Sequence, residues 1–190
     1  MKRQTGATMI EVLVTILIIS AGLLGMAGMQ ARSHSFEFES YQRAQALIIL
    51  QDIVSKMNAN ATYLDVDLTT TIDNLANYVT TGVGSGISDA SDCYGSSMTR
   101  AQSDLCEWSK SLKGAAELSG SQNAGAMING HGCIAQVSGT TSYLVSVVWQ
   151  GMSDTVPPVT DCGNSTSLYP SENRRRAVTA VVAIPDLGAP

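Results

Sequence analysis

The sequence predicts an α+β fold, in which one long N-terminal helix packs on a small antiparallel β-sheet formed by the end of the chain. Residues 30–57 contain neither proline nor glycine, and their apolar residues recur at helical spacing. Three short segments rich in apolar and β-branched residues follow residue 132, separated by turn residues and a long loop. A helical stretch followed by a run of strands is the order of an α+β protein, not of alternating βα units.

The composition excludes some classes of protein. The 190 residues suffice for one domain beside a membrane anchor. A formal net charge of −5 and a charged fraction of only 14% argue against nucleic-acid binding. Much of the 44% hydrophobic content lies in the first helix.

The most apolar stretch, residues 12–29, carries no charge and would form a helix of about 27 Å, close to the apolar thickness of a bilayer. Glu11 stands at its start, and a carboxylate at membrane depth costs about 3 kcal/mol on insertion scales. A signal anchor would hold Lys2 and Arg3 inside, and a secretory signal peptide would be cut after Ala27. Neither alternative explains Glu11.

Residues 6–14, with the sequence GATMIEVLV, resemble the class III leader of type IV pilins and pseudopilins, whose usual form is GFTLIEVLV. In that family a prepilin peptidase cuts after the glycine and methylates the new N-terminal amine. The resemblance therefore implies that Gly6 ends the leader and that Ala7, where phenylalanine is common, begins the mature chain. It also implies that Glu11 neutralises the amine of a neighbouring subunit during assembly, an ion pair that a low-dielectric core strengthens.

The resemblance also implies the pilin fold, a long spine helix packed on a small antiparallel sheet in a disulfide-bonded head. The expected parts are the removed leader at 1–6, the hydrophobic transmembrane or filament-core half of the helix at 7–29, its amphipathic half at 30–58 and the head at 59–190. Glycines 22, 25 and 28 indicate either close helix packing or local melting of the helix in a filament.

One helix is expected over about residues 8–58. Its predicted core stripe is Ala46, Leu47, Leu50, Ile53, Val54 and Met57. Ile48 and Ile49 lie off this stripe and are either ordinary exposed aliphatics or contacts to neighbouring helices.

The rest of the head follows from local patterns. A short helix is expected at 72–78, loops at 80–91 and 120–132, and a second helix at 98–118 with Leu105, Trp108 and Leu112 on one face. Strands are expected at 133–137, 143–150 and 176–184, forming a three-stranded antiparallel meander on the first helix.

Four cysteines behind a membrane-crossing segment indicate an oxidising compartment and two disulfides. Pairing of Cys93 with Cys106 and of Cys133 with Cys162 is favoured because short loops close most readily, while the other two connectivities stay open. Zinc binding is disfavoured because no C-x-x-C spacing occurs.

Other polar groups give no catalytic pattern, so no enzyme, cofactor or metal is expected. His34 and His131 are expected at the surface or in loops, and no serine lies in a G-x-S-x-G context. Asp89 and Asp92 form either a solvated acidic loop or, less favourably, a calcium site. The run of Arg174, Arg175 and Arg176 would blunt a strand edge or dock an acidic neighbour.

The resemblance thus implies a non-catalytic minor pilin that joins a type IV pilus, with roles in assembly, twitching motility and adhesion. Its expected partners are other minor and major pilins, the prepilin peptidase, the inner membrane before assembly and a host or surface receptor. Before assembly the head would lie in the periplasm, and afterwards in an extracellular pilus. A type II secretion pseudopilin, a membrane-anchored periplasmic enzyme or binding module, and a pilus-linked adhesin are the alternatives.

Overall fold

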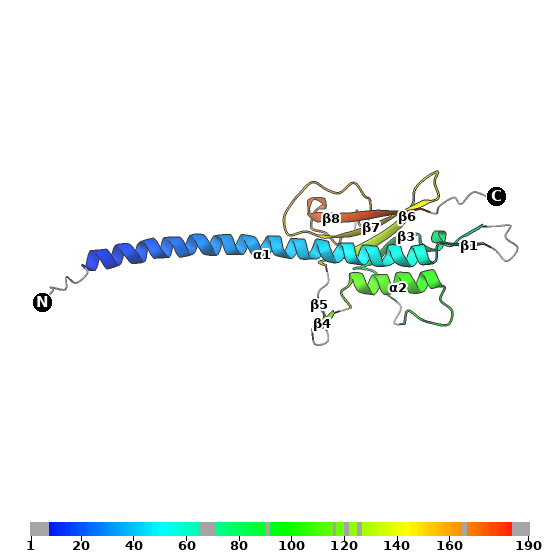
Figure 1. Ribbon diagram of the computed structural model, residues 1–190, viewed down its shortest axis with the longest axis horizontal. Coiled ribbons are helices and arrows are strands. Elements are labelled where there is room, and N and C mark those ends of the chain that lie inside the picture. Colours follow the sequence, from blue (N-terminus) through cyan, green and yellow to red (C-terminus); the bar gives the residue numbers. More distant parts are fainter. Residues whose placement is uncertain are drawn as a thin grey trace. The chain divides into compact units, whose positions relative to one another are not determined.

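The computed structural model describes residues 8–64, 71–89, 92–115, 117–119, 122–124, 127–164 and 167–183. The chain divides into two compact units, Met1–Ser40 and Tyr41–Pro190. The second unit contains the end of the long helix, a second helix and a four-stranded antiparallel sheet (Figure 1). The α+β pilin fold expected from the sequence is therefore confirmed.

Helix α1 runs over Met9–Ala59, in agreement with the single helix expected from the sequence. The buried residues of α1 are Gln42, Ala46, Ile49, Leu50, Ile53 and Met57. The predicted stripe was wrong at two positions, because Ile49 is 5% exposed while Leu47 is 40% exposed. At 3.6 residues per turn, Ile49 continues the face of Gln42, Ala46 and Ile53, whereas Leu47 lies at its margin.

The sheet has the strand order β3-β6-β7-β8, with all neighbours antiparallel. Its strands are β3 (Thr80–Gly84), β6 (His131–Gln136), β7 (Ser142–Gln150) and β8 (Arg175–Ala183). The three predicted strands are present, and each of their ends lies within two residues of the predicted position. The loop predicted at 80–91 was wrong, because these residues contain the edge strand β3. The glycines that suggested a loop serve packing, since a Cβ at Gly82 would overlap the ring of His131.

Helix α2, Arg100–Leu112, is shorter than the 98–118 expected and lies beside residues 41–59 of α1 (Figure 1). Thr99 and Gln102 form a capping box at its start. Gly114, with a φ of +76°, follows its end. Trp108 is fully buried and lies so close to β6 that a Cβ on Gly132 would come within 2.7 Å of its ring atom Cζ2.

One core joins the two helices to the sheet. Its largest members from the sheet and α2 are Trp108, Leu112, Ile134, Tyr143, Val145, Val147 and Trp149. A smaller cluster on β7's other side contains Cys133, Val148, Cys162 and Tyr169. Because the loop 151–174 covers this second side, β7 is apolar at successive positions instead of alternating.

The remaining elements are short. Strands β1 (Thr62–Leu64) and β2 (Thr71–Asp73) form one antiparallel pair, and β4 (Glu117–Ser119) and β5 (Gln122–Ala124) form another. The helix predicted at 72–78 is reduced to a 3₁₀ turn, η1 (Leu75–Tyr78), because its first residues pair in β2. Part of the loop predicted at 120–132 is likewise strand, in β5 and at the start of β6. A second 3₁₀ turn, η2 (Glu172–Arg174), leads into β8.

Candidate functional site

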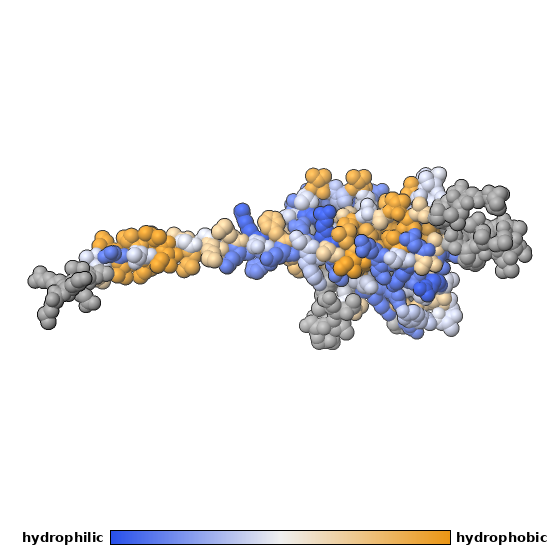
Figure 2. Space-filling model, viewed as in Figure 1, coloured by the Kyte–Doolittle hydropathy of each residue, from blue (hydrophilic) through white to orange (hydrophobic). Residues whose placement is uncertain are grey.

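The first part of α1 is covered by apolar side chains that no part of its own unit buries. All large apolar residues from 9 to 29 are exposed, from 47% at Val12 to 86% at Met9. They are Met9, Ile10, Val12, Leu13, Val14, Ile16, Leu17, Ile18, Ile19, Leu23, Leu24, Met26 and Met29. In the view of Figure 2 the first part of α1 is largely orange, with paler and blue atoms between the apolar ones. A helix that is apolar on every side requires lipid or other helices as its surroundings.

The length of this segment suits a bilayer. Helix α1 is the helix in the described chain that is long and apolar enough to cross a membrane, and its apolar window lies near the N-terminus. A signal sequence meets the same criteria of length and composition. The residues around the start of the helix must therefore distinguish a membrane anchor from a signal sequence.

Glu11 lies in the first turn of α1, where the positive end of the helix dipole favours an anion. The backbone N–H groups of Glu11 and Val12 both donate to the carbonyl oxygen of Thr8, at 3.0 and 3.3 Å. The predicted processing residues Gly6 and Ala7 lie outside the described residues. The structure thus places a carboxylate at the start of the apolar helix and leaves the cleavage position as a prediction.

The three glycines of the apolar segment meet no contact in the described chain. A Cβ built on Gly22, Gly25 or Gly28 has no atom within 4 Å. Among the described residues their small size therefore serves no packing. Close approach by a helix from outside and local melting of the helix in a filament both stay as predictions.

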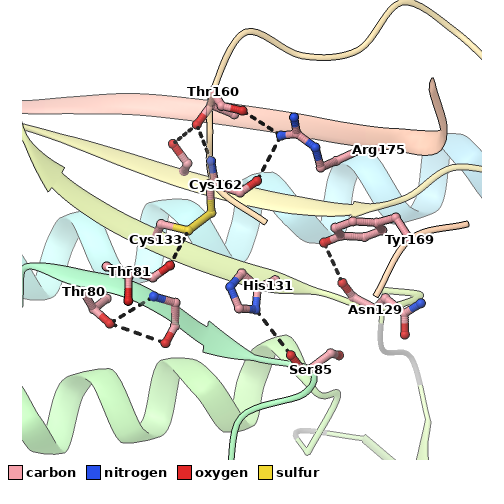
Figure 3. Close-up of a disulfide and its surroundings, with 12 residues drawn as sticks. Thr80, Thr81, Ser85, Asn129, His131, Cys133, Thr160, Cys162, Tyr169 and Arg175 are labelled. Atoms are coloured by element: carbon pink, nitrogen blue, oxygen red, sulfur yellow. Dashed lines mark hydrogen bonds between the residues drawn. A yellow bond between two sulfur atoms is a disulfide. The ribbon is translucent and has the colours of Figure 1, made fainter. Parts of the chain in front are cut away.

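In the head, the loop 151–174 is fastened to the sheet by a disulfide and an arginine. The structure joins Cys133 to Cys162 and Cys93 to Cys106, with Cα–Cα distances of 5.7 and 5.5 Å. These are the pairs that the sequence favoured. Beside the first disulfide, Arg175 donates to the carbonyl oxygens of Thr160 (2.7 Å) and Cys162 (2.9 Å), as Figure 3 shows.

The arginine run therefore holds the chain's own loop. Arg175 is 2% exposed and also donates to Glu172 at 2.7 Å. Arg174 pairs with Asp154 at 2.9 Å, and Arg176 donates to the carbonyl oxygen of Ser153. The sequence missed this role because many of the acceptors are backbone carbonyls, which leave no motif.

The acidic loop of Asp89 and Asp92 also forms contacts within the head. Asp89 accepts a hydrogen bond from Ser109 and pairs with Lys113 at 2.6 Å, while Asp92 accepts the backbone N–H of Tyr94. Among the described residues, no three of His, Cys, Asp and Glu are grouped so that they could hold a metal ion. These three contacts are those of a structural loop.

The two histidines differ in environment. His34 is exposed and lies 3.4 Å from Glu37, whereas His131 is buried in β6, so its predicted surface position was wrong. Burial lowers the pKa of His131, and its Nδ1 lies 3.3 Å from the carbonyl oxygen of Ser85 (Figure 3). The ring fills the space above Gly82 and is therefore a packing residue.

A groove of about 720 Å³ lies between the end of α1 and α2. Ile48 lines it and is 61% exposed, and Tyr94 at its rim is 74% exposed. Lys56 bridges the two helices by pairing with Asp52 (3.1 Å) and Glu107 (2.8 Å). Burial alone would lower the pKa of Lys56, but its bonds to both carboxylates raise it overall, so the bridge stays charged at neutral pH.

Comparison with known proteins agrees with the character of the N-terminus. Residues 1–27 match the family model described as the prokaryotic N-terminal methylation motif. No curated protein and no solved structure matches the chain. The matched segment contains the leader, Glu11 and most of the exposed apolar surface, and it supports a type IV pilin-like chain, a class that includes the pseudopilins.

Proposed function

We propose that this pilin-like chain is a structural, non-catalytic minor pilin. It is held in the inner membrane by the first part of α1, with its head in the periplasm, and is then taken into a type IV pilus. The observation that carries the proposal is the exposed apolar helix with Glu11 in its first turn, directly behind a methylation-type leader. Such a helix can be covered first by lipid and later by the helices of other subunits.

Electrostatics supply the assembly step. Cleavage after Gly6 would leave a positive amine at Ala7, one helical turn from Glu11. The carboxylate of one subunit then compensates the amine of its neighbour as both leave the bilayer surface for the filament core. In surroundings of low dielectric constant this compensation is worth far more than an exposed pair, because an unpaired buried charge is strongly unfavourable.

The expected partners follow from this step. They are the prepilin peptidase, other minor and major pilins and the inner membrane, and we propose contributions to twitching motility and adhesion through a host or surface receptor. Within the pilins, four features resemble the minor pilin PilV: residues 22–30 (GLLGMAGMQ), Trp108 before Leu112, Gly132 with Cys133, and residues 148–150 (VWQ). On that resemblance we propose a role in the complex that primes assembly near the pilus tip.

The N-terminus of the mature protein tests the proposal. We expect mass spectrometry of the N-terminal peptide to find Ala7 with a methylated amine in protein from wild-type cells. In cells lacking the prepilin peptidase, the same peptide should begin at Met1. A mature chain that begins at Gly28, or that keeps Met1 when the peptidase is present, would overturn it.

The location of the mature protein separates the proposal from a type II secretion pseudopilin, which would share the leader and the apolar helix. We expect the chain in filaments sheared from the cell surface together with the major pilin. Mature chain that stays entirely with the membrane fraction of piliated cells would favour the pseudopilin.

A further inference from the structure

The apolar surface of α1 ends at a basic and aromatic pair. No charged residue occurs between Glu11 and Arg32, which leaves twenty uncharged residues, 12–31. Helical geometry gives them a length of about 30 Å, equal to the hydrocarbon thickness of a typical bilayer. Glu11 and Arg32 would therefore lie at the two boundaries of the hydrocarbon layer.

The next turn of the helix would lie among the lipid headgroups. The headgroup layer adds about 5 to 8 Å on each side of the hydrocarbon, which is about three to five helical residues. Residues 32–36 fall within it. Arg32 and Phe36 are both exposed, and Phe36 is 70% exposed. Their spacing of four residues puts them on the same helix face, with their Cβ atoms about 5 to 6 Å apart.

The chemistry of the pair fits that layer. A guanidinium forms bidentate hydrogen bonds with phosphate, and a long side chain at the end of a span can reach the headgroups. Aromatic rings at both ends of membrane helices are typical of the interface. The lysine and arginine residues also orient the segment, since residues 1–6 contain two of them and residues 32–40 contain only Arg32.

We propose that Arg32 and Phe36 form an anchor for the phospholipid headgroups of the outer leaflet. Arg32 binds a lipid phosphate. The backbone of Phe36 lies further out, but helical side chains tilt toward the N-terminus of their helix, which brings its ring back beside Arg32, on the acyl-chain side of the headgroup layer. The anchor fixes how deep the helix sits before assembly, and its contacts must break when the subunit leaves the membrane. The inference rests on the proposed membrane anchoring of α1 and adds the depth and the ligand chemistry of its outer end.

The test uses the full chain in vesicles of phosphatidylethanolamine and phosphatidylglycerol, with Phe36→Trp as a reporter of depth. Trp108 and Trp149 are buried in the head, so the wild-type chain gives the background signal. We expect the new tryptophan to emit as in an apolar environment and to be quenched best by lipids brominated near the headgroup. Tyr41→Trp, five residues further along α1, should be quenched little.

Charge reversal tests the phosphate contact. In the Phe36→Trp background, Arg32→Glu should abolish most of the quenching by headgroup-proximal bromine, because the carboxylate repels phosphate. Arg43→Glu is the matched control, since Arg43 is exposed and lies eleven residues further along the same helix, and it should leave the quenching unchanged.

Two other results would overturn the inference. Vesicle-bound Phe36→Trp protein whose reporter is unquenched, or is quenched equally with and without Arg32→Glu, would show that the pair is no headgroup anchor while α1 still inserts. Failure of the wild-type chain to enter vesicles at all would instead overturn the proposed membrane anchoring, and the headgroup anchor with it.

Discussion

The hydroxyl of Tyr78 donates a hydrogen bond of 2.5 Å to the carboxylate of Asp104, and both side chains are buried. The same hydroxyl accepts a bond of 3.2 Å from the amide of Asn60, at the end of α1. Arg100 approaches the other carboxylate oxygen at 3.3 Å and compensates the charge. One buried carboxylate thus ties α2 to η1 and, through Tyr78, to the end of α1.

Removing this hydroxyl should destabilise the head. Tyr78→Phe keeps the ring but leaves Asp104 with one hydrogen bond fewer in a site that water does not reach. The expected loss in the free energy of unfolding is about 2 kcal/mol, the usual cost of leaving a buried polar group unsatisfied. Urea unfolding of the oxidised protein, followed by tryptophan fluorescence, measures it.

Tyr94→Phe is the matched control for that experiment. Tyr94 is 74% exposed, so loss of its hydroxyl should leave the urea midpoint unchanged. Equal midpoints for wild type and Tyr78→Phe would show that the bond to Asp104 contributes nothing to stability.

The same site should make stability depend on alkaline pH. Burial, together with the bond to Asp104, raises the pKa of Tyr78 to about 12, from 10.0 in an unfolded chain. A pKa raised on folding means that the neutral phenol stabilises the fold fully below pH 10 and that this contribution is lost as the pH rises from 10 to 12. Burial also raises the pKa of Tyr169, which adds to the loss.

We therefore expect the free energy of unfolding to be level between pH 8 and about pH 10 and to fall above it. Tyr78→Phe should fall less steeply, because the phenol of Tyr78, whose pKa is raised, is gone. Identical slopes for the two proteins above pH 10 would refute the assignment to Tyr78.

Much of the fold could be predicted because it depends on local patterns. The β7 segment consists largely of β-branched and aromatic residues, and α1 has an uninterrupted helical period, so each specifies its element without help from neighbours. The leader is likewise a local signal. Glu11, five residues after Gly6, is unfavourable in an ordinary apolar segment, so this combination stands out in the sequence.

The parts that escaped prediction depend on residues distant in sequence. Strand β3 contains two glycines, which in the sequence suggest a loop. In the folded chain the ring of His131 lies over Gly82 and leaves no room there for a Cβ. Ile49 is buried while Leu47 is 40% exposed, because the packing of the folded head decides which flank of the apolar stripe of α1 is covered, and helical periodicity alone does not. The role of Arg175 depends on two loop carbonyls that only the folded chain brings to it.

Arg175 should control the order of the loop 151–174. Arg175→Leu removes the donors to the carbonyl oxygens of Thr160 and Cys162 and leaves both acceptors short of partners beside the disulfide. The expected cost in unfolding free energy is about 2 to 4 kcal/mol, from charge-assisted bonds and unsatisfied acceptors. Limited proteolysis should cut the loop faster than in wild type, and the Cys133–Cys162 disulfide should still join the fragments where the cut falls before Cys162.

Arg174→Ala is the control for this variant. The ion pair of Arg174 with Asp154 is exposed, with side-chain exposures of 40% and 64%, and such pairs contribute at most about 1 kcal/mol. Cleavage of the loop at equal rates in Arg175→Leu and Arg174→Ala would show that the buried arginine has no special role there.

Glu11 should be needed for assembly and dispensable for insertion. Glu11→Ala makes the start of the apolar segment more apolar, so membrane insertion should persist, and cleavage after Gly6 should persist because the leader is intact. The variant lacks the carboxylate that compensates the amine of a neighbouring Ala7. Leaving one partner of a buried ion pair uncompensated costs about 3 to 5 kcal/mol, which corresponds to at least about a hundredfold weaker docking.

Immunoblots of sheared filaments and membranes measure this effect, with Glu37→Ala as the matched control. Glu37 is an exposed acid on the same helix, and it lies beyond the uncharged stretch, so its loss should leave incorporation unchanged. We expect the Glu11→Ala chain to be processed, to remain in the membrane fraction and to be nearly absent from filaments. A subunit at the end of the filament has a neighbour on one side only and would lose less. Wild-type amounts of Glu11→Ala in filaments would mean that this carboxylate neutralises no neighbouring amine.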